Sequence, residues 1–476
     1  MARMDRYRDD YKPPQAQEVP EIKFEETPQN VETPHEEFMP EEFKSEAKQE
    51  DSSTTIEELI ANNPELKEEL NYDYKDQPKK KKKGKGVLIV FIILLVGVAG
   101  FLAYQYFGPL KLKGPAEMVV YQGEEYVEQG TNSIFAKVSG KVNTKVLGDY
   151  TLTYTVGKQS VKRLVHVVDI NRLVLGLKGC ENTVVRQGDP YIESGAYAID
   201  KESGIVQDKK IKIKSNVNTS KPGKYSVTYT VNSGLVKKKI VRKVQVIATN
   251  DFVANTEGIP VLMYHYIYTA EDKPSDLNVN YTINTDFEAQ LKYLTENGYY
   301  YPSFDELRAY VDGKIALPEK SVILTFDDAQ YGFFNYGKAL LEQYKVPATS
   351  FVIGVQDGAN KVRVNASQYI QFQSHSYDMH KGGGNKGHGG VITSMTKAQI
   401  VEDLKKSFEI VGNTDALAYP YGDYNDTALE AVAEAGLDVA FTTEGGKVKV
   451  GADYRKLPRV RVSGGNSLED WIESLK

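Results

Sequence analysis

The pattern of hydrophobic and polar residues changes several times along the chain. Residues 1–86 lack a sustained apolar period and are rich in Glu, Asp, Pro, Gln and Lys, a composition that buries too little apolar surface to fold. Residues 87–107 are apolar and carry no charge, and this length is sufficient to cross a bilayer. We therefore predict a disordered tail over 1–86 and a transmembrane helix over 87–107.

Alternating polar and apolar residues follow the apolar segment, in a pattern that occurs twice. Alternation with Gly and Asp turns predicts β-sandwich modules, here over 114–170 and 171–248. The paired motifs resemble bacterial immunoglobulin-like surface domains: QGEEYVEQG (122–130) with QGDPYIESG (187–195), and GDYTLTYTV (148–156) with GKYSVTYTV (223–231). Neither module contains a cluster of catalytic groups, so we expect a stalk that is dispensable for chemistry, with weak glycan binding as the alternative.

From residue 259 to 476, short apolar runs alternate with amphipathic helical patterns. The run 321–326 (SVILTF) predicts a strand, and 303–313 predicts a helix that begins with a Ser303/Glu306 capping box. Repeated strand–helix alternation predicts a parallel α/β fold, here a deformed (β/α) barrel. In such barrels the reactive groups lie where strands end.

Charge and cysteine content narrow the class of protein. The formal net charge is -6 and no basic face is visible, which argues against a nucleic-acid partner. The single cysteine, Cys180, excludes an internal disulfide framework. The composition of the large exported region favours a Gram-positive bacterial surface protein.

The lysine cluster at 79–83 directly precedes the apolar segment, and such a cluster stays on the cytoplasmic side of a membrane. We therefore predict a cytoplasmic N-terminus and an extracellular catalytic domain at the cell membrane. The apolar segment lies too far from the N-terminus for a secretory signal peptide. The acidic tail is interpreted either as a docking segment for a cytoplasmic partner or as a solvated spacer.

Candidate metal ligands come from the histidines and one pair of aspartates. His375 and His380 are two of only six histidines, and Asp327 and Asp328 end the strand 321–326. Adjacent carboxylates repel each other at a buried strand end, and a cation offsets this repulsion. Two histidines with one of these carboxylates suit Zn²⁺, or another divalent ion such as Co²⁺, Ni²⁺ or Mn²⁺. The alternative is a histidine pair in a solvated loop.

The motifs LTFDD, SHSYDMH and YPYG occur in this order and resemble those of the polysaccharide deacetylases. This family is also called carbohydrate esterase family four, or the NodB homology domain, and the resemblance covers 259–476. It implies that Asp327 is the general base and that the backbone N–H of Tyr421 stabilises an oxyanion. It further implies that Asp328, His375 and His380 bind the metal, and that Ser376 steadies their loop.

The chain departs from the common family pattern at three places. The two motif histidines are five residues apart rather than four, Ala418 replaces the usual Arg, and no histidine follows His388. These departures resemble the branch that acts on poly-N-acetylglucosamine and related wall glycans, in which an early strand supplies the general acid. His265 fits that role, with a packed core histidine as the alternative.

Three further expectations concern the surroundings of the site. Neighbouring carboxylates would help His265 to hold a proton near its ordinary pKa. Arg459 or Arg461 would replace the missing Arg and orient Asp327. The loop with His388 would be mobile and would cover substrate.

Together these features predict a membrane-anchored, extracellular, metal-dependent deacetylase. It would remove N-acetyl groups from N-acetylglucosamine residues of a cell-wall or surface polysaccharide. The alternatives are an O-acetyl esterase that acts on a polysaccharide and a non-catalytic glycan-binding surface protein.

Overall fold

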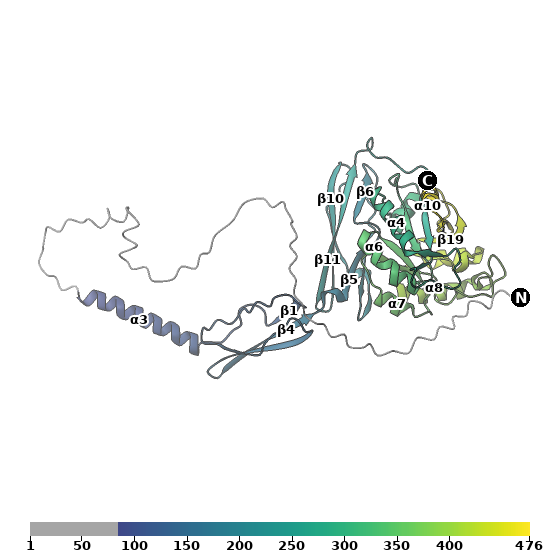
Figure 1. Cartoon of the computed structure of the whole chain (residues 1–476). Coiled ribbons are helices and arrows are strands. Elements are labelled where there is room, and N and C mark those ends of the chain that lie inside the picture. The colour runs from purple at the N-terminus through teal and green to yellow at the C-terminus, as the bar shows by residue number, and fades with distance from the viewer. Residues whose placement is uncertain (1–83) are drawn as a thin grey trace, which may run out of the picture. The chain divides into compact units, whose positions relative to one another are not determined.

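The computed structural model describes residues 84–476, and the predicted disordered tail falls almost entirely outside this range. Residues 104–476 form one compact unit. Helix α3 (Gly84–Phe107), most of which precedes this unit, is long and apolar enough to cross a membrane (Figure 1). Its large apolar side chains, from Leu88 to Phe107, are exposed in the structure.

The first β module consists of one four-stranded sheet with the strand order β1-β4-β3-β2. Strands β3 and β4 form an antiparallel hairpin, and β1 pairs with β4 in parallel. Alternate residues of β3 are buried, as the period-two pattern predicts. The strand bounds are β1 (Glu117–Tyr121), β2 (Lys137–Ser139), β3 (Gly148–Val156) and β4 (Gln159–Val168).

The second β module contains two sheets, with the orders β6-β11-β10-β9 and β5-β7-β8. Side chains from both sheets belong to one hydrophobic cluster that includes Leu173, Ala198, Tyr229 and Val244. Within the described residues the first module has a single sheet, so a sandwich in each module stays a prediction. The strand bounds are β5 (Leu173–Leu177), β6 (Asn182–Arg186), β7 (Ala196–Asp200), β8 (Gly204–Val206), β9 (Lys212–Ser215), β10 (Gly223–Ser233) and β11 (Val236–Ile247).

The C-terminal region forms a closed barrel of parallel strands, which confirms the predicted α/β barrel. The strand order around the barrel is β12-β15-β16-β17-β18-β19-β20, and pairing of β12 with β20 closes it. The bounds are β12 (Val261–Tyr264), β15 (Ile323–Phe326), β16 (Ala348–Val352), β17 (Ile370–Ser374), β18 (Ala416–Ala418), β19 (Val439–Gly445) and β20 (Leu457–Arg461). A small parallel pair, β13 (Tyr266–Tyr268) with β14 (Tyr281–Ile283), follows β12.

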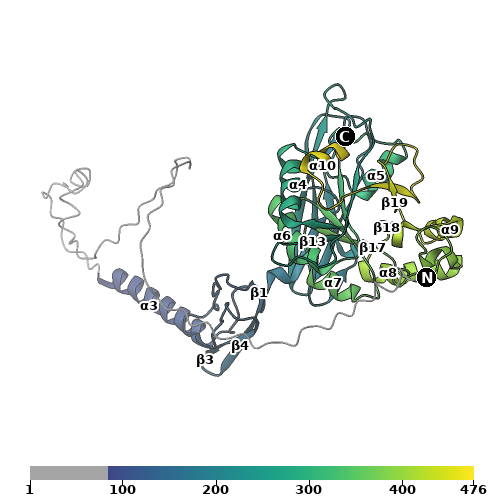
Figure 2. The same cartoon turned by 45° about the vertical axis from the view of Figure 1, so that its right-hand side comes forward.

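Helices flank the strands of the barrel (Figure 2). The predicted capping box at α5 is confirmed, because Ser303 Oγ accepts from Glu306 N (3.0 Å) and Glu306 Oε2 accepts from Ser303 N (2.9 Å). Every residue of β12, β15 and β16 is buried, as in strands covered on both sides. The helix bounds are α4 (Asn284–Glu296), α5 (Phe304–Val311), α6 (Lys338–Tyr344), α7 (Gly358–Val364), α8 (Lys397–Val411), α9 (Asp426–Glu434) and α10 (Leu468–Leu475).

The second β module contacts the barrel at the rim where the strands begin. Tyr197 Oη donates to Ser367 O (2.9 Å), just before β17, and Lys178 Nζ lies 2.8 Å from Asp415 Oδ2, just before β18. Tyr197 also belongs to the same hydrophobic cluster as Phe372 of the barrel. Removal of residues 114–248 would uncover these buried groups, and the expectation that these residues are dispensable for chemistry stays a prediction.

Candidate active site

Two adjacent carboxylates emerge where strand β15 ends. Asp327 and Asp328 follow Phe326, and their relative exposures are 3% and 8%. The backbone N–H of Asp327 donates to Tyr264 O (3.0 Å), which extends the pairing with β12. Asp328 then has a φ of 68°, a conformation that non-glycine residues seldom adopt and that turns its carboxylate away from the strand direction. Backbone outliers of this kind concentrate at functional sites.

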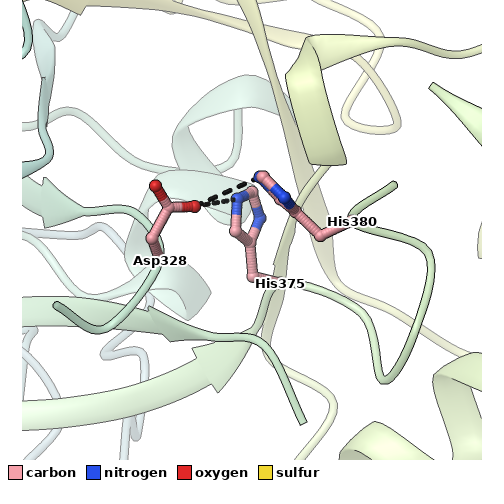
Figure 3. A group of neighbouring side chains, drawn as sticks. All are labelled: Asp328, His375 and His380. Atoms are coloured by element: carbon pink, nitrogen blue, oxygen red, sulfur yellow. Dashed lines mark ion pairs between the residues drawn. The ribbon is translucent and has the colours of Figure 1, made fainter. Parts of the chain in front are cut away.

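Asp328, His375 and His380 converge on one point (Figure 3). Asp328 Oδ1 lies 3.3 Å from His375 Nε2 and 3.2 Å from His380 Nε2, and the three ligand atoms all lie within 4.8 Å of one another. His375 directly follows β17. The structure thus brings together the aspartate and the two histidines that the sequence predicted as a set.

The geometry of these three groups fits a divalent metal ion. Two donors about 2.1 Å from a tetrahedral Zn²⁺ lie roughly 3.4 Å apart, close to the two separations measured here. His375 Nδ1 lies 2.7 Å from Ala418 O, so the donor Nε2 faces Asp328. Asp328 Oδ1 is buried and has no hydrogen-bond partner within 84–476, which is the state of an oxygen placed to bind a cation.

Charge within the cluster is consistent with this interpretation. Burial raises the pKa of Asp328, but the two imidazoles lower it by more, so the net shift is strongly downward. Burial lowers the pKa of His375, but Asp328 and Asp327 more than reverse this, so its pKa is raised. The buried negative charge of Asp328 therefore attracts positive charge to this point.

The loop between the two histidines is held by hydrogen bonds to its backbone. Ser376, with a φ of 72°, accepts from Met379 N through Oγ (3.1 Å), in agreement with its predicted steadying role. Asp403 accepts from Tyr377 N (2.7 Å) and Asp378 N (2.8 Å). Sequence reasoning missed Asp403, although an aspartate on the buried face of α8 was an available signal.

Arg459 binds Asp327 from strand β20. Its Nη1 and Nη2 atoms each lie 2.7 Å from one carboxylate oxygen, and the arginine is fully buried. Burial raises the pKa of Asp327, but the guanidinium lowers it by more, so the carboxylate stays ionised. Of the two predicted arginines, Arg459 therefore contacts Asp327, whereas Arg461 donates to Asn280 Oδ1 (2.8 Å).

His265 follows β12 and faces the same carboxylate. Its Nε2 lies 4.0 Å from Asp327 Oδ2, and its side chain is 13% exposed. Burial lowers the pKa of His265 by more than Asp327 and Asp328 raise it. The expectation that carboxylates would maintain its ordinary pKa is therefore wrong, because the loss of hydration outweighs their attraction.

Tyr421 lies beside His380 in the 3₁₀ turn Pro420–Gly422. Its φ is 61°, and its ring centroid lies 4.6 Å from that of His380. The oxyanion role of its backbone N–H stays a prediction. The loop with His388, expected to be mobile, is tied by hydrogen bonds to Asp423, two residues after Tyr421.

Comparisons with known proteins agree with this architecture. Residues 314–440 match the family "Polysaccharide deacetylase", and residues 175–246 match "Bacterial surface protein, Ig-like domain". A Bacillus subtilis protein whose name places it among the polysaccharide deacetylases is 29% identical over 229 residues, which is 46% of this chain and 77% of that protein.

One further curated protein and one solved structure that are similar to this chain are also named as deacetylases. The poly-β-1,6-N-acetyl-D-glucosamine N-deacetylase of Staphylococcus aureus is 27% identical over 202 residues, 39% of this chain and 69% of that protein. The solved structure of a Streptococcus pyogenes deacetylase in complex with acetate has a TM-score of 0.41 and 26% identity, and it covers 46% of this chain and 100% of its own.

Proposed function

We propose that the polysaccharide deacetylase domain of this chain is a metal-dependent N-deacetylase acting on N-acetylglucosamine residues of a cell-wall or surface polysaccharide. The observation that carries the proposal is the convergence of three metal donors beside an ionised, buried carboxylate and a histidine. Relatives named as polysaccharide deacetylases support the substrate class.

Asp328, His375 and His380 are the proposed ligands. Their donor set favours Zn²⁺, with Co²⁺, Ni²⁺ or Mn²⁺ as alternatives. A divalent ion held there would polarise the acetamido carbonyl and lower the pKa of a nearby water molecule. The hydrogen bond from His375 Nδ1 to Ala418 O fixes the ring so that Nε2 is the donor.

Asp327 is the proposed general base. It accepts a proton from the water whose oxygen forms the new bond to the acyl carbon. Arg459 holds both carboxylate oxygens in one orientation and keeps the group ionised between turnovers. The backbone N–H of Tyr421 is the proposed hydrogen-bond donor to the carbonyl oxygen as it gains negative charge.

His265 is the proposed general acid. It donates a proton to the amide nitrogen as the carbon–nitrogen bond breaks, which gives acetate and a free amine on the sugar. The depressed pKa of His265 makes its protonated form a stronger acid toward this leaving group. Asp327 Oδ2 lies 4.0 Å from His265 Nε2. A proton can therefore return to His265 from the side of Asp327.

The proposed setting is the outer face of a bacterial membrane, with Gram-positive bacteria as the proposed source. Helix α3 would anchor the chain, the N-terminal tail would remain cytoplasmic, and a surface glycan would be the partner of the barrel. A cytoplasmic partner for the acidic tail is a further part of this proposal.

The test of the proposed activity is incubation of the metal-loaded chain with N-acetylglucosamine oligomers and, separately, with an O-acetylated xylan. We expect equal amounts of acetate and free amine from the first substrate. Acetate from the xylan alone would identify an esterase, and acetate from neither would favour a glycan-binding protein.

A further inference from the structure

A tight glycine-rich hairpin begins directly after His380. Val391 N donates to Lys381 O (2.9 Å), and Gly384 N donates to Gly389 O (2.8 Å). Gly389 has a φ of 88°, in the left-handed region that favours glycine. The glycines of this run thus specify a folded hairpin over 381–391.

The buried carboxylate of Asp423 fixes this hairpin. Its Oδ2 accepts from Gly390 N (2.7 Å) and its Oδ1 accepts from His388 N (2.8 Å), while its side chain is 3% exposed. Asp423 N in turn donates to Pro420 O (3.1 Å). One residue therefore joins the hairpin to the turn that carries Tyr421.

The hairpin lies against the candidate active site. A Cβ added at Gly390 would lie 3.0 Å from Tyr421 Cδ2, and one added at Gly387 would lie 2.0 Å from Asp423 Oδ1. Since the Tyr421 ring packs beside His380, the hairpin borders the metal cluster on the Tyr421 side. No side chain larger than glycine fits at Gly387 without displacing Asp423.

His388 is the exposed reactive group on this hairpin. Its side chain is 70% exposed, and its Nδ1 lies 3.2 Å from Asp423 Oδ1. A carboxylate that already accepts two backbone N–H bonds is an acceptor, so Nδ1 carries the proton in this contact. In the neutral imidazole with this tautomer, Nε2 is the acceptor on the outer edge of the ring.

We propose that the hairpin 381–391 forms one wall of the glycan-binding surface and that His388 binds the sugar next to the one that loses its acetyl group. Nε2 of His388 accepts a hydrogen bond from a hydroxyl or an acetamido N–H of that sugar. Asp423 is a positioning residue that acts through His388. This inference rests on the proposed deacetylase function and names a residue that contacts the glycan beyond the reacting sugar.

The first test compares His388→Ala with the wild-type chain, both loaded with metal, on N-acetylglucosamine oligomers of two and five units. Loss of one hydrogen bond to a neighbouring sugar should raise KM for the pentamer about fivefold to tenfold and leave kcat within about twofold. His388→Gln keeps an acceptor and should recover part of the loss. Lys405→Ala, at an exposed position of helix α8 outside the hairpin, is the control and should match wild type.

The second test uses Asp423→Asn, which keeps the shape of the side chain and removes its charge. We expect the pentamer KM to rise as in His388→Ala, with no further rise in the double variant, because both changes affect one contact. Faster hydrogen exchange at the amides of His388 and Gly390 would show that the hairpin has loosened. Full additivity of the two changes would contradict the positioning role.

Pentamer binding to the chelator-treated chain separates this inference from the proposed activity, because it requires no turnover. Weaker binding by His388→Ala than by wild type supports the inference whether or not acetate is released. Unchanged binding and unchanged KM in His388→Ala would overturn it, even if the wild-type chain proved to be an active deacetylase. Absence of acetate release by the wild-type chain would refute the proposed function alone.

Discussion

Arg459 holds both oxygens of Asp327 at 2.7 Å across a separation of 132 residues in sequence. Bidentate guanidinium–carboxylate pairs are strong and fix orientation as well as charge. Arg459 is itself anchored by donation from Nε to Thr442 O (2.9 Å). The last strand of the barrel therefore determines the orientation and ionisation of a carboxylate at the end of the second.

Loss of this pair should affect both stability and activity. Arg459→Ala leaves the buried Asp327 charge unpaired, so we expect the free energy of unfolding to fall by roughly 3–5 kcal/mol. Arg461→Ala, two residues along the same strand, removes an exposed contact to Asn280 and should cost about 0.5 kcal/mol or less. Urea unfolding measures the free energy of unfolding of both variants. Equal losses in the two variants would show that the buried pair is unimportant for stability.

The two adjacent aspartates should separate metal binding from turnover. Asp328→Ala removes one of three donors and should lose both bound metal and activity. Asp327→Asn should retain the metal and lower kcat by about 10²–10⁴-fold, as expected for loss of a general base. Metal content, measured by mass spectrometry, and acetate release together distinguish the two roles. Metal loss in Asp327→Asn with retention in Asp328→Ala would mean that the two roles are exchanged.

His265→Ala should keep the fold and the metal while lowering kcat by about 10²-fold or more. The acid form of His265 is lost as pH rises, and burial lowers its pKa. The alkaline limb of the wild-type rate profile should therefore fall below the ordinary histidine pKa of about 6.5, and it should disappear in the variant. A metal-loaded His265→Ala chain with near-normal kcat would exclude His265 as the acid.

Asp305 should make stability depend on pH at the rim that contacts the second module. Burial and the charge of Asp415 together raise the pKa of Asp305 to about 7, against the opposing effect of Lys178. The folded state therefore favours the neutral acid, and stability falls as pH rises from the unfolded-state pKa of about 3.9 through the folded value. We expect Asp305→Asn to raise Tm at pH 8 and to have little effect at pH 4.

Asp312→Asn, at the opposite end of helix α5, is the control for this prediction. Hydrogen bonding to Lys314 lowers the pKa of Asp312, so its ionisation favours the folded state and the substitution should give no gain at pH 8. Thermal unfolding across this pH range tests both variants. A Tm gain for Asp305→Asn that is equal at pH 4 and pH 8 would point to a cause other than ionisation.

The predicted membrane topology is open to a direct measurement. The lysine cluster before the apolar segment should keep residues 1–78 inside the cell. Protease added to intact cells should digest the barrel and spare an epitope placed in the tail. A protected barrel with a digested tail would reverse the orientation.

Sequence reasoning grouped Asp328, His375 and His380, which the structure brings together, because these residues occur in short motifs at the ends of apolar runs. It missed Asp403, whose place on the buried face of α8 was the available signal, and it could not identify Asp423, because the partners of Asp423 are backbone N–H groups distant in sequence, which carry no residue signature. The choice between Arg459 and Arg461 was also undetermined. The two residues are two positions apart on β20, so strand alternation places both side chains on the same face. Only the closed barrel shows that Arg459 lies inside it while Arg461 reaches the rim.

The contact between the second β module and the barrel also bears on where the chain can be cut. Lys178, Tyr197 and their partners tie this module to the rim at which the strands begin, opposite the end that carries Asp328 and His375. A recombinant fragment that starts at residue 250 would expose the barrel rim that the second β module covers. A fragment that starts near residue 171 would keep this rim covered. Any tension transmitted from the N-terminal side would enter the barrel through this rim, and the end that carries Asp328 and His375 would bear little of that load.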